Sequence, residues 1–189
     1  MILSIGESHP KKWKIGAAVI KAVEGTDHTH SFVSWRDEHL DIRKVAEARG
    51  GGGRIVINEQ FRQENEIVRI FQYDITEDKL KELETWIWKN MKPYGYKHNL
   101  GLGIMRLGNR LLQIFGSKEI AQNPFKDGLF SQICVELTAR SISLATGLKL
   151  PGNIEDYGLR EMHEFNFEMY RQEKCSMASD MLIGQINAG

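Results

Sequence analysis

The sequence predicts an α+β fold built around one main core. Most runs in which apolar and polar residues alternate, as in strands, fall between residues 31 and 75. Segments with helical spacing of apolar residues lie before and after them. The chain has 189 residues, of which 41% are hydrophobic, so a core can form without disulfides or a structural metal. Strands gathered in one region with helices elsewhere are typical of the α+β class.

The first half of the chain carries the predicted sheet. It opens with a short strand over 2–5 and a helix over 17–23, which ends at Gly25 because glycine readily adopts the left-handed conformation of a helix stop. Alternation then predicts three strands in a meander, followed by a helical turn at 60–65 and one more strand. These four strands are expected over 31–37, 42–48, 55–57 and 67–73.

Helical spacing dominates after residue 75. A helix is expected to begin after Thr76, a good N-cap, and to end before Pro93, and a second one spans 132–146 up to Gly147. Residues 94–110 are predicted to be a glycine-rich loop. Residues 155–180 contain seven acids against three bases, which indicates a solvated helix and a loose end. We therefore expect a main domain over 1–150 and an acidic helix and tail over 151–189, packed on that domain or extending from it.

Charge and hydropathy argue against several classes of protein. Lys plus Arg and Asp plus Glu number 25 each, so no global positive field favours nucleic acid as a partner. The longest apolar run, 15–23, is interrupted by Lys21 and is far shorter than the roughly 20 residues of a membrane-spanning helix. The first residues lack the charge order of a secretory signal, and the two cysteines fit a reducing compartment. A cytoplasmic location is the simplest expectation.

Cys134 is the candidate nucleophile, because it is predicted to lie in the first turn of a helix. The positive end of the helix dipole and the unpaired backbone N–H groups there stabilise a thiolate. The same N–H groups can bind the oxyanion of a tetrahedral intermediate. The alternative is that Cys134 is a small buried side chain without chemistry, since free cysteine is among the most buried residue types. Cys175 lies in a polar stretch and is expected to be an inert surface thiol.

His30 and Glu47 are the candidate base and its orienting carboxylate. His30 is expected at the rim of a strand, where an imidazole is held rigidly. Glu47 has small and apolar neighbours on the next strand and can fix the tautomer of His30. Asp37 and Glu38 compete for that role. The plain alternative for Glu47 is a solvated charge on an edge strand.

A metal site and a phosphate loop are the alternatives to this triad. His28 and His30 share one face of a strand and His39 follows near a hairpin, so zinc could bind there, but no further cysteine or histidine cluster has ligand spacing. We expect no metal and no cofactor. The run Gly50–Gly53 lacks the Gly-Lys-Ser/Thr ending of a phosphate loop and is followed by a strand, so it is expected to be a flexible hairpin tip.

With the order histidine, carboxylate, cysteine established, the sequence resembles the circularly permuted papain-like hydrolases, namely the YiiX-like branch of the NlpC-type superfamily of cysteine peptidases and amidases. The matching pieces span about residues 13–150. They are the helix over 17–23, the segments 29–33 and 45–48, the connection Tyr94-Gly95-Tyr96, and the segment 130–137. The resemblance implies an antiparallel sheet of about four to six strands packed against the helix that carries Cys134.

The resemblance implies a thiol hydrolase in which Cys134 attacks, His30 transfers protons and Glu47 orients His30. A peptide or a peptidoglycan amide is the first expected substrate, and a lipid or thioester acyl group is the second. Such folds also resemble structural components of phage particles, in which the triad is residual, so a virion location and other virion proteins as partners stay open. Tyr96 is a candidate oxyanion donor. The third option is the zinc site at His28, His30 and His39.

Overall fold

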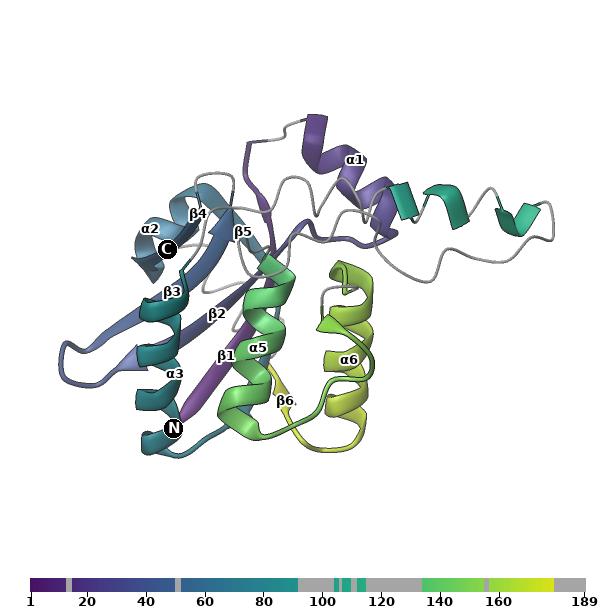
Figure 1. Cartoon of the computed structure of the whole chain (residues 1–189). Coiled ribbons are helices and arrows are strands. Elements are labelled where there is room, and N and C mark those ends of the chain that lie inside the picture. Colours follow the sequence, from purple (N-terminus) through teal and green to yellow (C-terminus); the bar gives the residue numbers. More distant parts are fainter. Residues whose placement is uncertain are drawn as a thin grey trace.

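The computed structural model describes residues 1–12, 15–49, 52–91, 104–105, 107–109, 112–114, 134–154 and 157–178 (Figure 1). Its strands are β1 (Ile2–Pro10), β2 (His30–Asp37), β3 (Ile42–Arg49), β4 (Gly52–Ile57), β5 (Asn65–Asp74) and β6 (Ser176–Met177). Its helices are α1 (Ile15–Glu24), α2 (Asn58–Glu64), α3 (Glu77–Asn90), α5 (Cys134–Thr146) and α6 (Leu159–Arg171).

The six strands form one antiparallel sheet in the order β4-β3-β2-β1-β5-β6. The α+β class and the expected antiparallel sheet are therefore confirmed. β1 lies in the interior of the sheet, and its register pairs Ser8 with His30 and Glu7 with Ser31. β3 lies between β2 and β4, so Glu47 is on an interior strand and faces Arg54 across the β3–β4 ladder. The edge-strand alternative for Glu47 is wrong.

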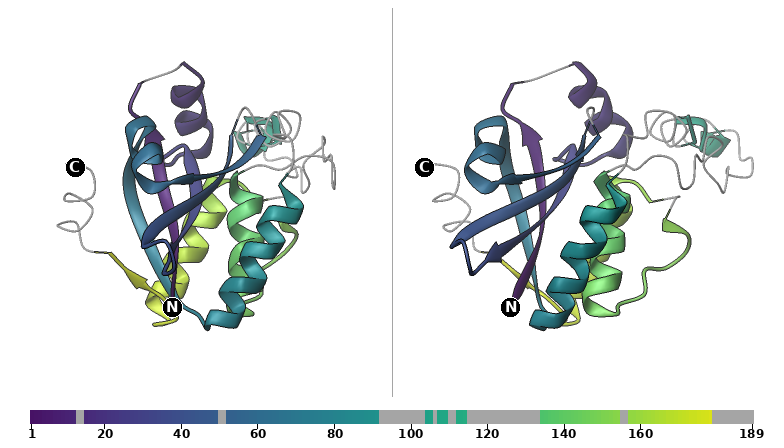
Figure 2. Two further views of the ribbon diagram at one scale, coloured as in Figure 1. Left: turned by 90° about the vertical axis from the view of Figure 1, so that its left-hand side faces the viewer. Right: turned by 60° about the vertical axis from the view of Figure 1, so that its left-hand side comes forward.

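Three helices cover one face of the sheet and α2 lies on the other (Figure 2). α5 is the middle helix, with α3 and α6 on its two sides (Figure 1). The larger core fills the space under these helices and includes Leu3, Ile5, Val33, Trp35 and Leu137, all at most 1% exposed. A smaller apolar cluster on the opposite face contains Phe32, Val45, Phe61, Ile67, Ile70 and Ala178. Because both faces are covered, the interior strands β1 and β2 are mostly buried.

Local sequence signals explain the limits of several elements. Gly25 has a φ of 69° and ends α1, as the left-handed preference of glycine predicts. The hydroxyl of Thr76 accepts a hydrogen bond of 3.3 Å from the backbone N–H of Lys79, so Thr76 caps α3. The predicted strands and helices correspond to β1–β5, α1, α3 and α5, with β1 extending to Pro10. In the stretch 94–110, predicted as loop, the described residues 104–105 and 107–109 are helical.

The C-terminal helix α6 is not the solvated helix that the net charge of its segment predicts. α6 buries Leu159, Met162, Phe165, Asn166 and Met169 against the main core. Its acidic residues lie on the remaining face, so the net charge of the segment hides an amphipathic helix. After α6 the chain returns to the sheet, where the two-residue strand β6 pairs with β5. The described residues 157–178 thus pack on the domain instead of extending from it.

No helix among the described residues is long and apolar enough to span a membrane.

Candidate active site

Cys134 is the first residue of α5, as the sequence predicts. Its side chain belongs to the main core and is 6% exposed. The first turn of α5 is fixed to β2, because the Ser31 hydroxyl donates a hydrogen bond of 3.2 Å to Thr138, whose own hydroxyl donates to the Cys134 carbonyl oxygen at 3.1 Å. These two hydroxyl hydrogen bonds therefore fix the position of Cys134 relative to the start of β2.

His30 is the first residue of β2, and both its polar partners are candidate site residues. Its Nε2 lies 2.7 Å from Glu47 Oε2, and its ring stacks on Phe61 with 6.4 Å between centroids. Burial alone would lower the pKa of His30, but hydrogen bonding and charge from Cys134 and from Glu47 raise the pKa to about 10. Because Nε2 faces Glu47, Nδ1 is the ring nitrogen left for the sulfur.

Glu47 is 1% exposed. Burial would raise the pKa of its carboxyl group, but the His30 imidazole and the Arg54 guanidinium outweigh burial and hold the pKa at about 2. Arg54 Nε donates to Glu47 Oε1 at 2.6 Å, while Oε2 faces His30, so each carboxylate oxygen has its own cationic partner. Arg54 also reaches Glu64 on α2 at 2.7 Å.

Arg54 is the site residue that sequence reasoning missed. The signal was present, because β3 and β4 form a hairpin around the glycine run and Arg54 is the cross-strand partner of Glu47. Pairing the two strands residue by residue would have put a basic side chain opposite the buried acid. The number of residues in the turn could not be read from four consecutive glycines, so the register stayed open.

Other sequence-predicted residues lie elsewhere. Asp37 is at the opposite end of β2 from His30, where it accepts from Lys44 at 2.6 Å and from the backbone N–H groups of His39 and Leu40 at 3.1 Å. The adjacent Glu38 is exposed in the same turn. Neither residue orients His30. Tyr96 and most of its glycine-rich connection lie outside the described residues.

The zinc alternative built on His28, His30 and His39 is wrong. His30 is bonded to Glu47, His39 is exposed in the β2–β3 turn, and the His28 ring faces Glu7 and Asp27. Cys175 is also not a surface thiol. It is half-buried, packs against the main core and lies 3.8 Å from the Asn166 carbonyl oxygen, and burial raises its pKa. Its neighbours are Asn166 and Tyr73, so Cys175 lies outside the candidate site.

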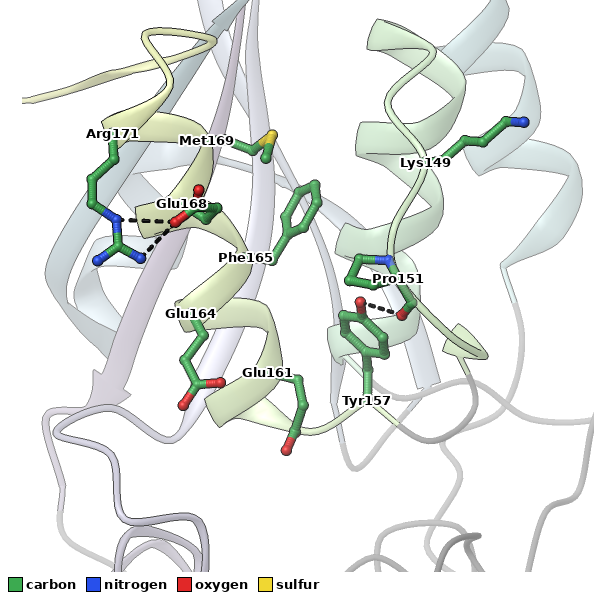
Figure 3. Close-up of a pocket in the computed structure, with 9 residues that line it drawn as sticks. All are labelled: Lys149, Pro151, Tyr157, Glu161, Glu164, Phe165, Glu168, Met169 and Arg171. Carbon is green, nitrogen blue, oxygen red and sulfur yellow. Dashed lines mark hydrogen bonds and ion pairs between the residues drawn. The ribbon is translucent and has the colours of Figure 1, made fainter.

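A cavity of about 500 Å³ lies between α6 and the segment that joins α5 to α6 (Figure 3). Phe165, Met169, Tyr157 and Pro151 supply its apolar lining, and the acidic side chains come from α6. The Tyr157 hydroxyl donates to the Pro151 carbonyl oxygen at 2.6 Å and fixes this segment. The lining includes none of the three candidate site residues, so this cavity is separate from Cys134.

No protein-family profile, no curated protein and no solved structure gives a significant match to this chain. The chemistry of the site must therefore be argued from its geometry.

Proposed function

We propose that this chain is a thiol hydrolase of the permuted papain-like type, which cleaves an amide bond with Cys134, His30 and Glu47. The observation that carries the proposal is the chain of polar contacts from Arg54 through Glu47 to His30 and on to the sulfur at the start of α5. A buried histidine held by a buried carboxylate is an arrangement that supplies a proton-transfer group of fixed orientation. A structural cysteine requires neither partner.

The proposed reaction has two steps. The Cys134 thiolate attacks the carbonyl carbon, and backbone N–H groups at the start of α5 stabilise the resulting oxyanion. His30 gives its proton to the leaving amine as the C–N bond breaks, which yields a thioester. His30, now neutral, removes a proton from water, and the hydroxide formed in this way attacks the thioester and releases the acid and the thiolate. Glu47 keeps the ring oriented throughout.

Peptide and peptidoglycan amides are the first proposed substrates, and lipid or thioester acyl groups are the second. Both classes pass through the same thioester intermediate, so the triad alone does not choose between them. Incubating the purified chain with a peptide amide, a peptidoglycan stem peptide and an acyl thioester, each with the Cys134→Ala variant as the blank, separates the two classes. A chain that serves only as a particle component would turn over none of them.

Alkylation of Cys134 tests the triad without a known substrate. In a Cys175→Ser chain Cys134 is the only thiol. If His30 holds the sulfur as a thiolate, the rate of reaction with iodoacetamide falls little between neutral pH and about pH 5, whereas an ordinary thiol loses about tenfold per pH unit. Mass spectrometry of the intact chain over time gives the rate.

His30→Ala is the matched variant, because it removes the imidazole and leaves Cys134 in place. It should restore the steep pH dependence of an ordinary thiol, while the thermal unfolding curve checks that the chain still folds. Equal pH profiles in the two chains, or a Cys134 that reacts only after unfolding, would contradict the proposed hydrolase and favour a scaffold with a residual triad.

A further inference from the structure

A second group of ionisable side chains lies on the helix-covered face of the sheet, apart from the triad. Glu7 follows Leu3 and Ile5 on the same face of β1 and is 2% exposed. His28, in the turn before β2, is 1% exposed, and His163 comes from the first half of α6 and is 27% exposed. The group therefore joins the centre of the sheet, a turn and a helix that are far apart in sequence.

The donor atoms of these three side chains converge. Glu7 Oε1 lies 2.8 Å from His163 Nδ1, and Glu7 Oε2 lies 3.6 Å from His28 Nδ1. One donor atom from each residue lies within 4.8 Å of the other two. A tetrahedral zinc ion with nitrogen and oxygen ligands at about 2.0–2.2 Å requires ligand atoms separated by about 3.3 Å. The observed separations need only small side-chain rotations to reach that value.

Charge in the cluster also fits a cation. Arg69 Nη1 lies 2.5 Å from Glu7 Oε2, and its Nη2 lies 2.8 Å from Asp27 Oδ2. One guanidinium thus faces two carboxylates, and one negative charge is left when both imidazoles are neutral, as they are when bound to a metal. Arg69 contacts Oε2 of Glu7, whereas Oε1 faces His163. Because Oε2 faces both Arg69 and His28, an ion bound through Oε1 requires His28 to move a short distance toward Oε1.

We propose that Glu7, His28 and His163 bind one Zn²⁺ ion, with water as the fourth ligand. Asp27 lies beside the site, where its Oδ1 is 3.0 Å from His28 Nδ1 and its Oδ2 accepts from Arg69. Imidazole and carboxylate ligands are a set that zinc uses commonly. The ion would tie α6 to β1 and to the turn that leads into His30, two residues after His28. Its role is structural, and it is independent of the hydrolase proposal.

Zinc titration tests this site in a chain with Cys134→Ala and Cys175→Ser, because a thiol beside His30 would bind zinc by itself. Calorimetry at neutral pH should give one equivalent of bound Zn²⁺, and Co²⁺ should give the visible spectrum of a tetrahedral site. Saturating Zn²⁺ should raise the midpoint of thermal unfolding by roughly 5 °C. His163→Gln should weaken binding at least about tenfold and abolish the shift.

His39→Gln is the matched control, since His39 is exposed in the β2–β3 turn and lies outside the cluster. It should leave both the affinity and the shift unchanged. Diethyl pyrocarbonate labelling gives a measurement that needs no ligand variant: Zn²⁺ should protect His163 and not His39. Absence of binding, equal losses in the two variants, or unprotected His163 at saturating Zn²⁺ would each overturn the assignment.

Discussion

Two carboxylates, Glu47 and Glu7, are almost fully buried, and each contacts an imidazole and a guanidinium. Arg54 and His30 contact Glu47, and Arg69 and His163 contact Glu7. In both cases the arginine comes from a neighbouring strand, so the register of the sheet provides the compensating charge. Removing one member of such a group leaves an uncompensated buried charge, which costs more than the pair itself contributes.

Glu47→Gln is therefore expected to lower the free energy of unfolding at neutral pH by roughly 3 kcal/mol. The pKa of Glu47 falls from 4.5 to about 2 on folding. A depressed pKa contributes stability above the unfolded value, and this contribution is lost as the pH falls from 4.5 toward about 2. The difference between Glu47→Gln and the parent chain should shrink over that window. Urea unfolding at several pH values measures this difference in the free energy of unfolding.

Glu82→Gln is the control for this change, because Glu82 forms an exposed ion pair with Lys79 on α3. Exposed pairs contribute little, so the control should unfold like the parent chain at each pH. A Glu47→Gln chain that stays as stable as the control at neutral pH would mean that the carboxylate is not ionised in the folded chain.

The sequence was informative about residues whose signal is local. Cys134 at a helix start and His30 at a strand start follow from periodicity and end signals, and Glu47 follows from its apolar neighbours. Arg54 depends on the register across four glycines, and the Glu7–His163 contact joins residues 156 positions apart. Such pairs arise from tertiary packing, which no periodic pattern in a single sequence encodes.

At the scale of elements, the contact between β1 and β2 depends on a glycine. A Cβ atom at Gly6 would lie 1.9 Å from Cζ of Phe32, which is 1% exposed and packs on Phe61 at 4.5 Å between centroids. The ring therefore occupies the space where a side chain of β1 would be. β1 and β2 can pair with the Phe32 ring packed over Gly6 because glycine has no side chain.

Gly6→Ala is expected to destabilise the chain by about 1–3 kcal/mol, because the Phe32 ring must leave its packed position. Gly53→Ala on β4 is the control, since its Cβ would meet Met91 at an ordinary 3.4 Å. Urea unfolding of both variants gives the comparison. Adding Phe32→Leu should recover part of the loss in the Gly6→Ala chain, as coupled neighbours do. Equal stabilities of the two alanine variants would contradict this packing.

The difference between local sequence signals and tertiary packing also explains which elements the sequence predicts. Strands β2, β3 and β5 have enough alternating residues to be recognised, and α5 has both apolar spacing and a glycine stop. β6 has two residues and therefore no period to detect. For α6, net charge pointed to solvent, although its buried residues recur at helical spacing. Amphipathic spacing was the better guide to its place in the fold than charge.

At the scale of the whole molecule, the C-terminal segment shares the core of the sheet. The Tyr73 hydroxyl donates to Asn166 Oδ1 at 2.7 Å in the interior, and Arg160 Nε donates to the Glu24 carbonyl oxygen at 2.8 Å. α6 is thus linked both to β5 and to the end of α1. The division predicted at residue 150 separates segments of the sequence, whereas these contacts join the two parts in space.

Because α6 and the sheet share one core, they are expected to unfold together. Native-state hydrogen exchange at rising urea concentration should give peptides from β1 and from α6 the same opening free energy. Tyr73→Phe leaves the buried Asn166 amide without its hydroxyl partner and should lower both values by about 1–2 kcal/mol. Tyr170→Phe, on the exposed side of α6, is the control and should change neither. If α6 peptides opened at a lower free energy, and Tyr73→Phe changed only their value, α6 would be an independently stable appendage and the shared-core interpretation would fail.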